Sequence, residues 1–163
     1  MTKVSEHIQI KGGADLAALI LRRPDSIGRF PGVEHAYVGQ PGLRMQMRIQ
    51  PMGITLHDSV LLAWSKDRVD NDTHIYPFRI EGGRWLHGTG EMAFADAPAD
   101  CTMATLSWEP EIPATLSVVP GMRRAIKRWL KRSSRDWLVA MKTQIEPRNE
   151  SACGAFTLAD VGA

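Results

Sequence analysis

The chain has 163 residues, of which 44% are hydrophobic and 23% charged, and its formal net charge is +2. This mixture excludes an intrinsically disordered chain, and the length fits one domain that buries roughly 68–70% of its unfolded surface. No run approaches the ~18–20 apolar residues of a membrane span, and residues 1–6 lack the apolar core of a signal peptide. We therefore expect a cytoplasmic protein. Two cysteines, Cys101 and Cys153, are too few for a disulfide framework.

The first thirty residues predict a strand followed by two short helices. Residues 4–10 alternate loosely between apolar and polar side chains and end at Gly12-Gly13. Residues 15–23 carry leucine and isoleucine at helical spacing, and this helix should stop before Pro24, because the residue before a proline avoids the helical conformation. A second short helix should follow over residues 24–30, with Asp25 as its N-cap.

A long β region occupies residues 43–108. Apolar side chains fall on every second position in five runs, over residues 43–49, 54–64, 76–80, 86–94 and 104–108. The exceptions are Asp58 in the second run and Gly88 and Gly90 in the fourth. The turns between the runs are short, so neighbouring strands should pair antiparallel. Strand follows strand without an intervening helix, which excludes a doubly wound parallel sheet.

One long helix should close the chain. Neither proline nor glycine occurs between Gly121 and Pro147, and an apolar stripe recurs about every 3.6 residues. At ~1.5 Å per residue this helix would be about 36 Å long, the span of a domain. Residues 147–163 are interpreted as a C-terminal tail. The stripe comprises Ile126, Trp129, Leu130, Ser133, Trp137, Met141 and Ile145.

This order of elements resembles the helix-grip fold of the START-like (SRPBCC) superfamily. The segment Arg29-Phe30-Pro31-Gly32-Val33-Glu34 is similar to the Pro-Gly-Val segment in the branch that contains polyketide cyclase-like proteins and relatives of a carbon monoxide dehydrogenase component. The resemblance implies an α+β fold in which a curved antiparallel sheet of six to seven strands wraps around the C-terminal helix. Residues 1–146 would form a single START-like ligand-binding domain with a cavity between sheet and helix.

The resemblance implies that this cavity binds a lipid-like, quinone-like or polyketide-like molecule, and it implies no shared catalytic residue. The apolar positions of the strands and the apolar stripe of the helix predict which residues line the cavity. Ordinary core packing explains many of these apolar positions equally well. The candidate pocket residues are Met47, Leu56, Asp58, Tyr76, Phe78, Met92, Leu106, Trp129, Ser133 and Trp137.

Asp58 interrupts an otherwise apolar strand phase. A buried carboxylate needs a partner or a proton, so Asp58 would be a polar anchor or general base inside the cavity. Alternatively, a β-bulge at Asp58-Ser59 would turn the side chain to solvent.

Two other patterns carry less information. Gly88-Thr89-Gly90-Glu91-Met92-Ala93 matches G-x-G-x-x-A, but a strand continues where a nucleotide site needs a helix. Its glycines should instead let the strand bend or admit bulky side chains. The five histidines share no metal-ligand spacing, and we expect neither a metal nor a cofactor.

Positive charge is concentrated near the C-terminus. Residues 1–118 carry 11 basic and 14 acidic side chains, whereas residues 119–163 carry 9 and 4. The run is a solvated helix face, or it contacts a membrane surface or an acidic protein partner. We do not expect nucleic acid, because no aromatic-rich strand motif accompanies the charge. The run comprises Arg123, Arg124, Lys127, Arg128, Lys131, Arg132 and Arg135.

Three functions are compatible with these patterns. We favour a non-catalytic binding or carrier protein for a hydrophobic small molecule. The first alternative is an enzyme of the polyketide cyclase/dehydratase type, with Asp58 or Tyr76 as acid or base. The second is an accessory protein that docks to a membrane or an acidic partner through its basic C-terminal helix.

Overall fold

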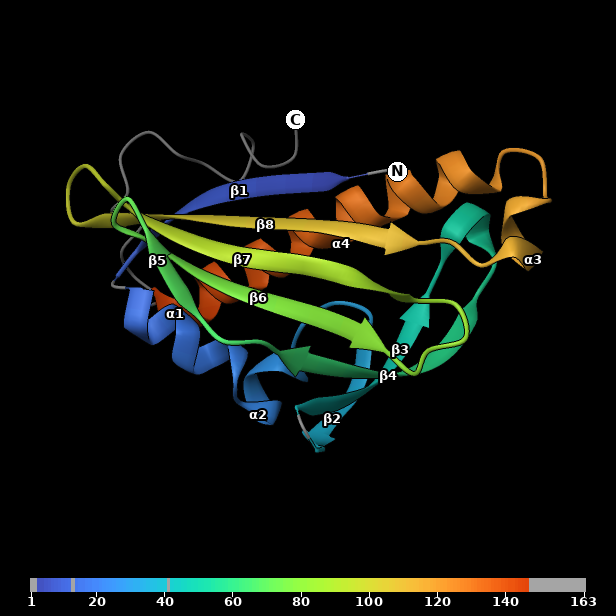
Figure 1. Ribbon diagram of the computed structural model, residues 1–163, viewed down its shortest axis with the longest axis horizontal. Helices are drawn as coiled ribbons and strands as arrows, with labels where there is room; N and C mark the ends of the chain where they lie inside the picture. Colours follow the sequence, from blue (N-terminus) through green and yellow to red (C-terminus); the bar gives the residue numbers. More distant parts are fainter. Residues whose placement is uncertain (1–2, 13, 41, 147–163) are drawn as a thin grey trace.

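The computed structural model describes residues 3–12, 14–40 and 42–146 (Figure 1). The predicted tail, residues 147–163, lies outside the described residues. In chain order the elements are β1 (Val4–Lys11), α1 (Ala14–Leu21), α2 (Pro24–Ile27), β2 (Val33–Val38), β3 (Leu43–Ile49), the 3-10 helix η1 (Pro51–Gly53), β4 (Leu56–Trp64), β5 (Arg68–Asp70), β6 (Thr73–Glu81), β7 (His87–Ala97), β8 (Cys101–Glu111), α3 (Ala114–Ser117) and α4 (Met122–Ile145).

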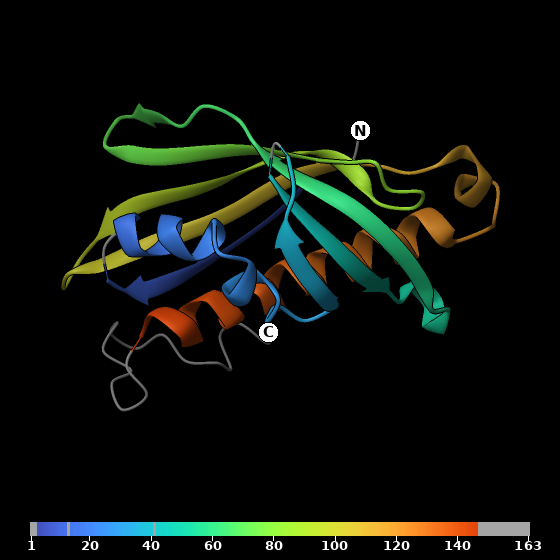
Figure 2. The same cartoon turned by 90° about the horizontal axis from the view of Figure 1, so that it is seen from below.

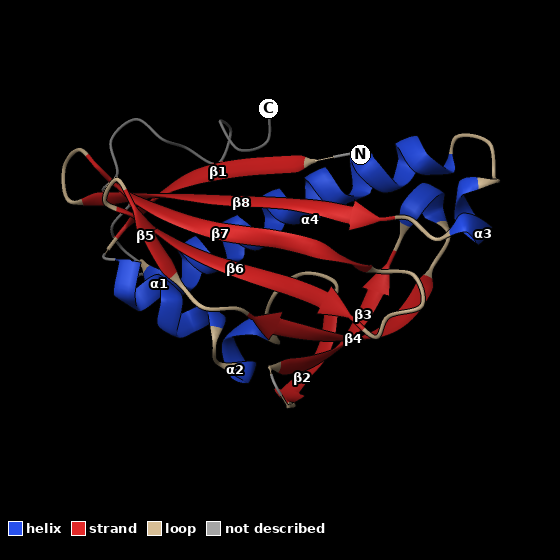
Figure 3. Cartoon of the chain, viewed as in Figure 1, coloured by secondary structure: helices blue, strands red, loops and turns tan. Residues whose placement is uncertain are grey.

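The strands form one curled antiparallel sheet in the order β1-β8-β7-β6-β4-β3-β2, and the short β5 pairs with β6 beside this path (Figure 3). Seven strands along the path and a long C-terminal helix confirm the predicted α+β helix-grip architecture. Every second residue of β3 is buried and the residues between are exposed, as the alternation of its sequence predicts.

Helix α4 covers the concave face of the sheet (Figures 1 and 2). Its buried stripe includes Leu130, Leu138 and Met141, each at most 1% exposed. The backbone of α4 runs closest to β1 at one edge and to η1 at the other, while the central strands curve away from it. In the middle of the helix, therefore, only side chains fill the space between α4 and the central strands.

The Phe30-Pro31-Gly32 segment fixes the middle of α4. The indole Nε1–H of Trp137 donates to the Pro31 carbonyl oxygen at 2.7 Å, and its ring packs on Phe30 with 5.7 Å between centroids. Gly32 has φ +84°, and its carbonyl accepts from the Arg48 amide at 2.8 Å. A side chain at this left-handed position would be strained. The segment is thus a contact point for the long helix.

A buried ion pair fixes the C-terminal end of α4. The Lys142 ammonium donates to the Gln9 carbonyl at 2.8 Å and to the Glu146 carboxylate at 2.9 Å. Glu146 also accepts from the Lys11 amide at 2.8 Å. Both charges are nearly enclosed, so each depends on these partners for its solvation. The last turn of the helix is thereby tied to the edge strand β1.

The structure corrects several local expectations. Arg23, not Asp25, occupies the N-cap position of α2, because Pro24 is the first helical residue. The pairing of β3 with β4 is continuous through Asp58, so the bulge considered there is absent. The sequence patterns also missed β2, β5 and α3. In the described part of the chain, no helix has the length and apolar character needed to cross a membrane.

Gly90 makes room for two aromatic side chains of the sheet. It lies between Phe78 on β6 and Trp108 on β8 in the register. A Cβ atom at Gly90 would overlap the Cβ of Trp108 and lie 2.6 Å from the Cζ of Phe78. The glycine therefore admits bulky side chains of the two neighbouring strands, whereas the prediction from the sequence was that it admits those of the helix.

Gly90→Ala should therefore destabilise the fold by about 1–3 kcal/mol, because the added methyl group displaces well-packed rings. Urea unfolding would measure the change. Thr89→Ala is the matched control, since Thr89 is exposed on the opposite face of the same strand. Equal stability of the two variants would show that the sheet accommodates a methyl group at Gly90 without strain.

Candidate ligand cavity

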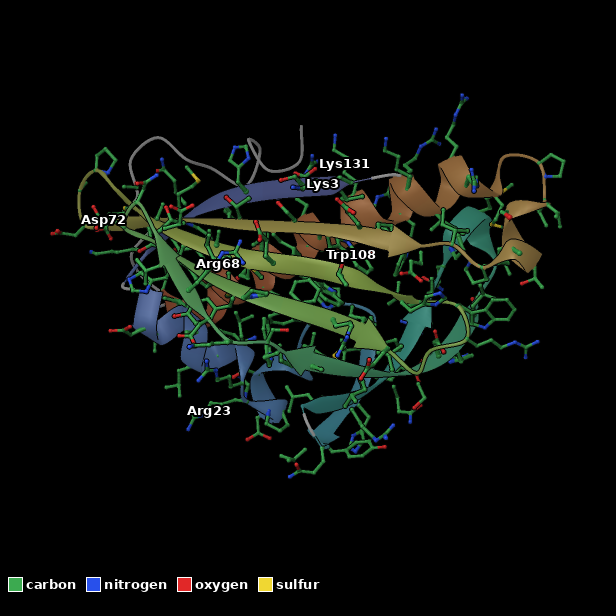
Figure 4. All side chains as sticks on the ribbon, viewed as in Figure 1. Lys3, Arg23, Arg68, Asp72, Trp108 and Lys131 are labelled. Atoms are coloured by element: carbon green, nitrogen blue, oxygen red, sulfur yellow. The ribbon has the colours of Figure 1, made fainter. Side chains whose placement is uncertain are left out.

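An apolar cavity lies between the concave face of the sheet and the middle of α4. Strands β3, β6 and β8 and the loop before β7 form one wall, and residues 129–137 of α4 form the other. Figure 4 labels one lining residue, Trp108 on β8. The lining side chains are Met47, Phe78, Ile80, Leu86, Leu106, Trp108, Trp129, Leu130, Ser133, Ser134 and Trp137.

The enclosed space is small. About 20 Å³ is open to the centre of a water molecule, whereas a wider envelope of about 320 Å³ includes solvent at the mouth. The first value describes the enclosed volume, and roughly 10–15 Å³ by that measure holds one water molecule. The cavity therefore has room for about one water, and any larger ligand must displace wall side chains.

Six of the ten predicted pocket residues line this cavity. They are Met47, Phe78, Leu106, Trp129, Ser133 and Trp137. Met92 and Tyr76 belong to the hydrophobic core and Leu56 packs against it, but none of the three lines the cavity. Asp58 does not line the cavity either.

Five lining residues were not predicted from the sequence. Ile80 and Trp108 lie two positions after Phe78 and Leu106, so the alternation of their strands already placed them on the inner face. Leu86 was predicted to begin a strand in phase with Met92, but it lies in the loop just before β7. Leu130 belonged to the predicted helix stripe but not to the predicted pocket, and Ser134 to neither.

Asp58 is buried and organises the loop between β6 and β7. Its side chain is 6% exposed and accepts backbone N–H groups from Ser59, Arg84, Trp85 and Leu86 at 2.8–3.0 Å. Three of these donors belong to consecutive loop residues. The carboxylate thus faces neither solvent nor the cavity, and its two oxygens are occupied by the loop that places Leu86 in the cavity wall.

Asp58→Asn should destabilise the protein by about 1–3 kcal/mol, because an amide NH₂ would replace one acceptor and face a backbone donor. Urea unfolding measures this directly. Asp70→Asn is the control, since Asp70 is exposed on β5. If the two substitutions cost the same, the four hydrogen bonds would not stabilise the loop.

Tyr76 lies beside α1 rather than α4. Its ring packs against Phe94, and the guanidinium of Arg22 lies 5.9 Å from the ring centroid. Burial raises the pKa of the Tyr76 phenol, and the carboxylates of Asp67 and Asp15 raise it further, while Arg22 lowers it. The phenol is therefore neutral at physiological pH and does not meet Asp58 in the cavity.

Comparison with known proteins agrees with the geometry. No family model matches the sequence, and no curated protein matches it either. Among solved structures, a START superfamily protein from Mycobacterium smegmatis superposes with a TM-score of 0.66 at 13% identity, over 88% of this chain and 96% of that one. The fold is that of the START superfamily.

Two further solved structures extend the comparison. A conserved protein from Geobacillus kaustophilus matches with a TM-score of 0.69 at 14% identity, over 88% of this chain and 95% of that one. An aromatase/cyclase from a Streptomyces species matches with a TM-score of 0.65 at 18% identity, over 94% of this chain and 98% of that one. At these identities the likeness concerns the fold.

None of the described side chains that line the cavity is a histidine, lysine, arginine or carboxylate. His57 is exposed and pairs with Glu34 at 3.1 Å, and His87 contacts Glu111 at 3.5 Å. No three histidine, cysteine or acidic side chains of the described segments gather into a metal site. The cavity therefore offers two serine hydroxyls and, for the rest, apolar and aromatic surface.

Proposed function

We propose that this protein binds and carries a hydrophobic small molecule of lipid-like, quinone-like or polyketide-like character between the sheet and α4. The observation that carries the proposal is the composition of the cavity wall, which is apolar or aromatic except for Ser133 and Ser134. Burial of apolar ligand surface against such a wall stabilises the complex by about 25 cal/mol per Å² of surface removed from water. Its START-like fold is shared with proteins whose names indicate ligand chemistry, including an aromatase/cyclase.

The geometry favours binding over catalysis. A cyclase or dehydratase needs at least two polar groups that converge on the ligand. Asp58 is held by four backbone amides, and Tyr76 lies beside α1. Serine hydroxyls without a neighbouring base are weak acids and bases. The described cavity lining contains no histidine, carboxylate or lysine beside Ser133 and Ser134.

An uncharged, environment-sensitive dye such as Nile red should bind the folded protein, and Ser133→Phe should weaken binding at least tenfold by filling the cavity. Fluorescence titration measures this. Thr143→Phe, which adds the same ring at an exposed position of α4, should leave the affinity unchanged. Failure of the wild type to bind the dye, or equal binding by Ser133→Phe, would contradict the proposal. Mass spectrometry of molecules that co-purify with the native protein would name the ligand class.

A second candidate function is docking to an anionic membrane. At the end of the molecule where α3 meets α4, Val118 and Val119 are 78% and 40% exposed, a few residues before Arg123 and Arg124 (Figures 1 and 2). Exposed apolar side chains beside cations are typical of surfaces that rest on lipid. Each cation near an anionic bilayer contributes about 1 kcal/mol.

Sedimentation with phosphatidylserine-containing vesicles tests this function. At low salt the wild type should pellet with the vesicles, and added salt should release it, because the attraction is screened within a Debye length of about 8 Å at physiological salt. Reversal of three charges near Val118 should abolish pelleting, whereas reversal of three exposed cations elsewhere should not. If both variants pellet equally, or the wild type stays in solution, the basic face is only a solvated helix surface. The test variant is Arg123→Glu/Arg124→Glu/Lys127→Glu, and the control is Arg44→Glu/Arg48→Glu/Lys66→Glu.

A further inference from the structure

A second, cationic hollow adjoins the apolar cavity. It has a volume of about 220 Å³ and lies between η1 and the first half of α4. Trp129 lines both the hollow and the cavity, so its side chain is the partition between them. The lining residues are Gln50, Met52, Gly53, Ala125, Arg128, Trp129 and Arg132.

The two arginines of the hollow are unpaired within the described residues. Both side chains are exposed, and neither Arg128 nor Arg132 has an ion pair there. They lie one helical turn apart, a spacing at which like charges repel. By contrast, Glu6 on β1 pairs with Lys131 at 3.9 Å and Arg135 at 3.4 Å, and Figure 4 shows Lys131 beside β1. Glu6 therefore offsets part of the positive charge on the other flank of α4, whereas no described acidic side chain pairs with the arginines of the hollow.

An anion would relieve the repulsion between these arginines. Guanidinium groups bind carboxylate and phosphate through paired N–H···O bonds, which are stronger than neutral hydrogen bonds. None of the described lining residues of the hollow is acidic, so no side chain there competes for Arg128 and Arg132. The hollow is thus suited to an oxyanion.

Trp129 has fewer polar contacts than the other tryptophan of α4, Trp137. Trp137 donates its indole N–H to Pro31, whereas Trp129 makes no hydrogen bond within the described part of the chain and is half-buried. Across the hollow stands Met52, a flexible side chain that is 58% exposed and adapts to varied apolar shapes. A rotamer change of Trp129 would join the hollow to the 20 Å³ cavity.

We infer that the ligand is an anionic amphiphile, with its carboxylate or phosphate head between Arg128 and Arg132 and its apolar tail past Trp129 in the cavity. This inference rests on the proposed function, because it needs the cavity to accept the tail. Beyond the proposed function, it specifies the charge of the ligand, the orientation of the ligand in the site, and Trp129 as the residue that controls entry.

Displacement of the uncharged dye by three compounds of equal chain length tests the head group. Dodecanoate or dodecyl phosphate should displace the dye at a concentration at least tenfold lower than dodecanol. Arg128→Gln/Arg132→Gln should remove that advantage and leave the affinities for dodecanol and the dye unchanged. Arg123→Gln/Arg124→Gln, which removes the same charge outside the hollow, should retain it.

The outcomes separate this inference from the proposed function. If dye and dodecanol bind but neither anion has an advantage, or both double variants lose it equally, the head-group site is wrong and the carrier function stands. If inorganic phosphate competes as strongly as dodecyl phosphate, the arginines bind a free anion and the joined site is wrong. If the dye and all three compounds fail to bind, the carrier function itself fails.

Stopped-flow mixing with the dye tests the partition. Trp129→Ala should raise the association rate about tenfold, and Trp129→Phe should give an intermediate rate, because a smaller side chain leaves the passage open. Thermal unfolding checks that both variants are folded. An unchanged rate in the folded Trp129→Ala variant would show that Trp129 does not control entry.

Discussion

The docking of α4 on the concave face is the constraint on which the rest of the structure depends. A curled sheet presents an apolar concave face, and α4 runs along it while the shorter α1 packs beside one end of α4. The helix is held at its C-terminal end by the Lys142–Glu146 ion pair on β1 and near its middle by the Trp137–Pro31 hydrogen bond. With its path fixed by these contacts, the helix follows the sheet edges and leaves a gap over the central strands. The cavity is a geometric result of that arrangement.

The cavity remains apolar although Asp58 lies on one of the strands of the sheet, because its carboxylate bonds to a loop instead. Asp58 occupies an inner strand position, yet the amides of residues 84–86 take both of its oxygens. The same interaction holds Leu86 in the cavity wall. The cavity would therefore select the proposed ligand mainly by shape and apolar surface. Selection by charge would come from the adjoining hollow, which Arg128 and Arg132 line.

The sequence predicted the elements whose apolar residues recur with a regular period. Alternation identified most of the central strands, and the 3.6-residue stripe identified α4, because each periodicity reflects one buried face. Strand β2 was missed because its burial lacks alternation, and α3 because four residues carry no period. Asp58 was singled out correctly as unusual. Its role was not predictable, because its partners lie 26–28 residues later in a loop whose position depends on the finished sheet.

The basic run shows why a charge pattern alone left several functions open. As a sequence it is one block, but the fold divides it. Lys131 and Arg135 turn toward Glu6 on β1, Arg128 and Arg132 border the hollow, and Arg123 and Arg124 stand near the exposed valines at the α3 end. Each pair meets a different environment although all share one helix. Since the apolar stripe carries the packing, charges in one environment can be removed without disturbing the core, and stability and binding become separable properties of the same helix.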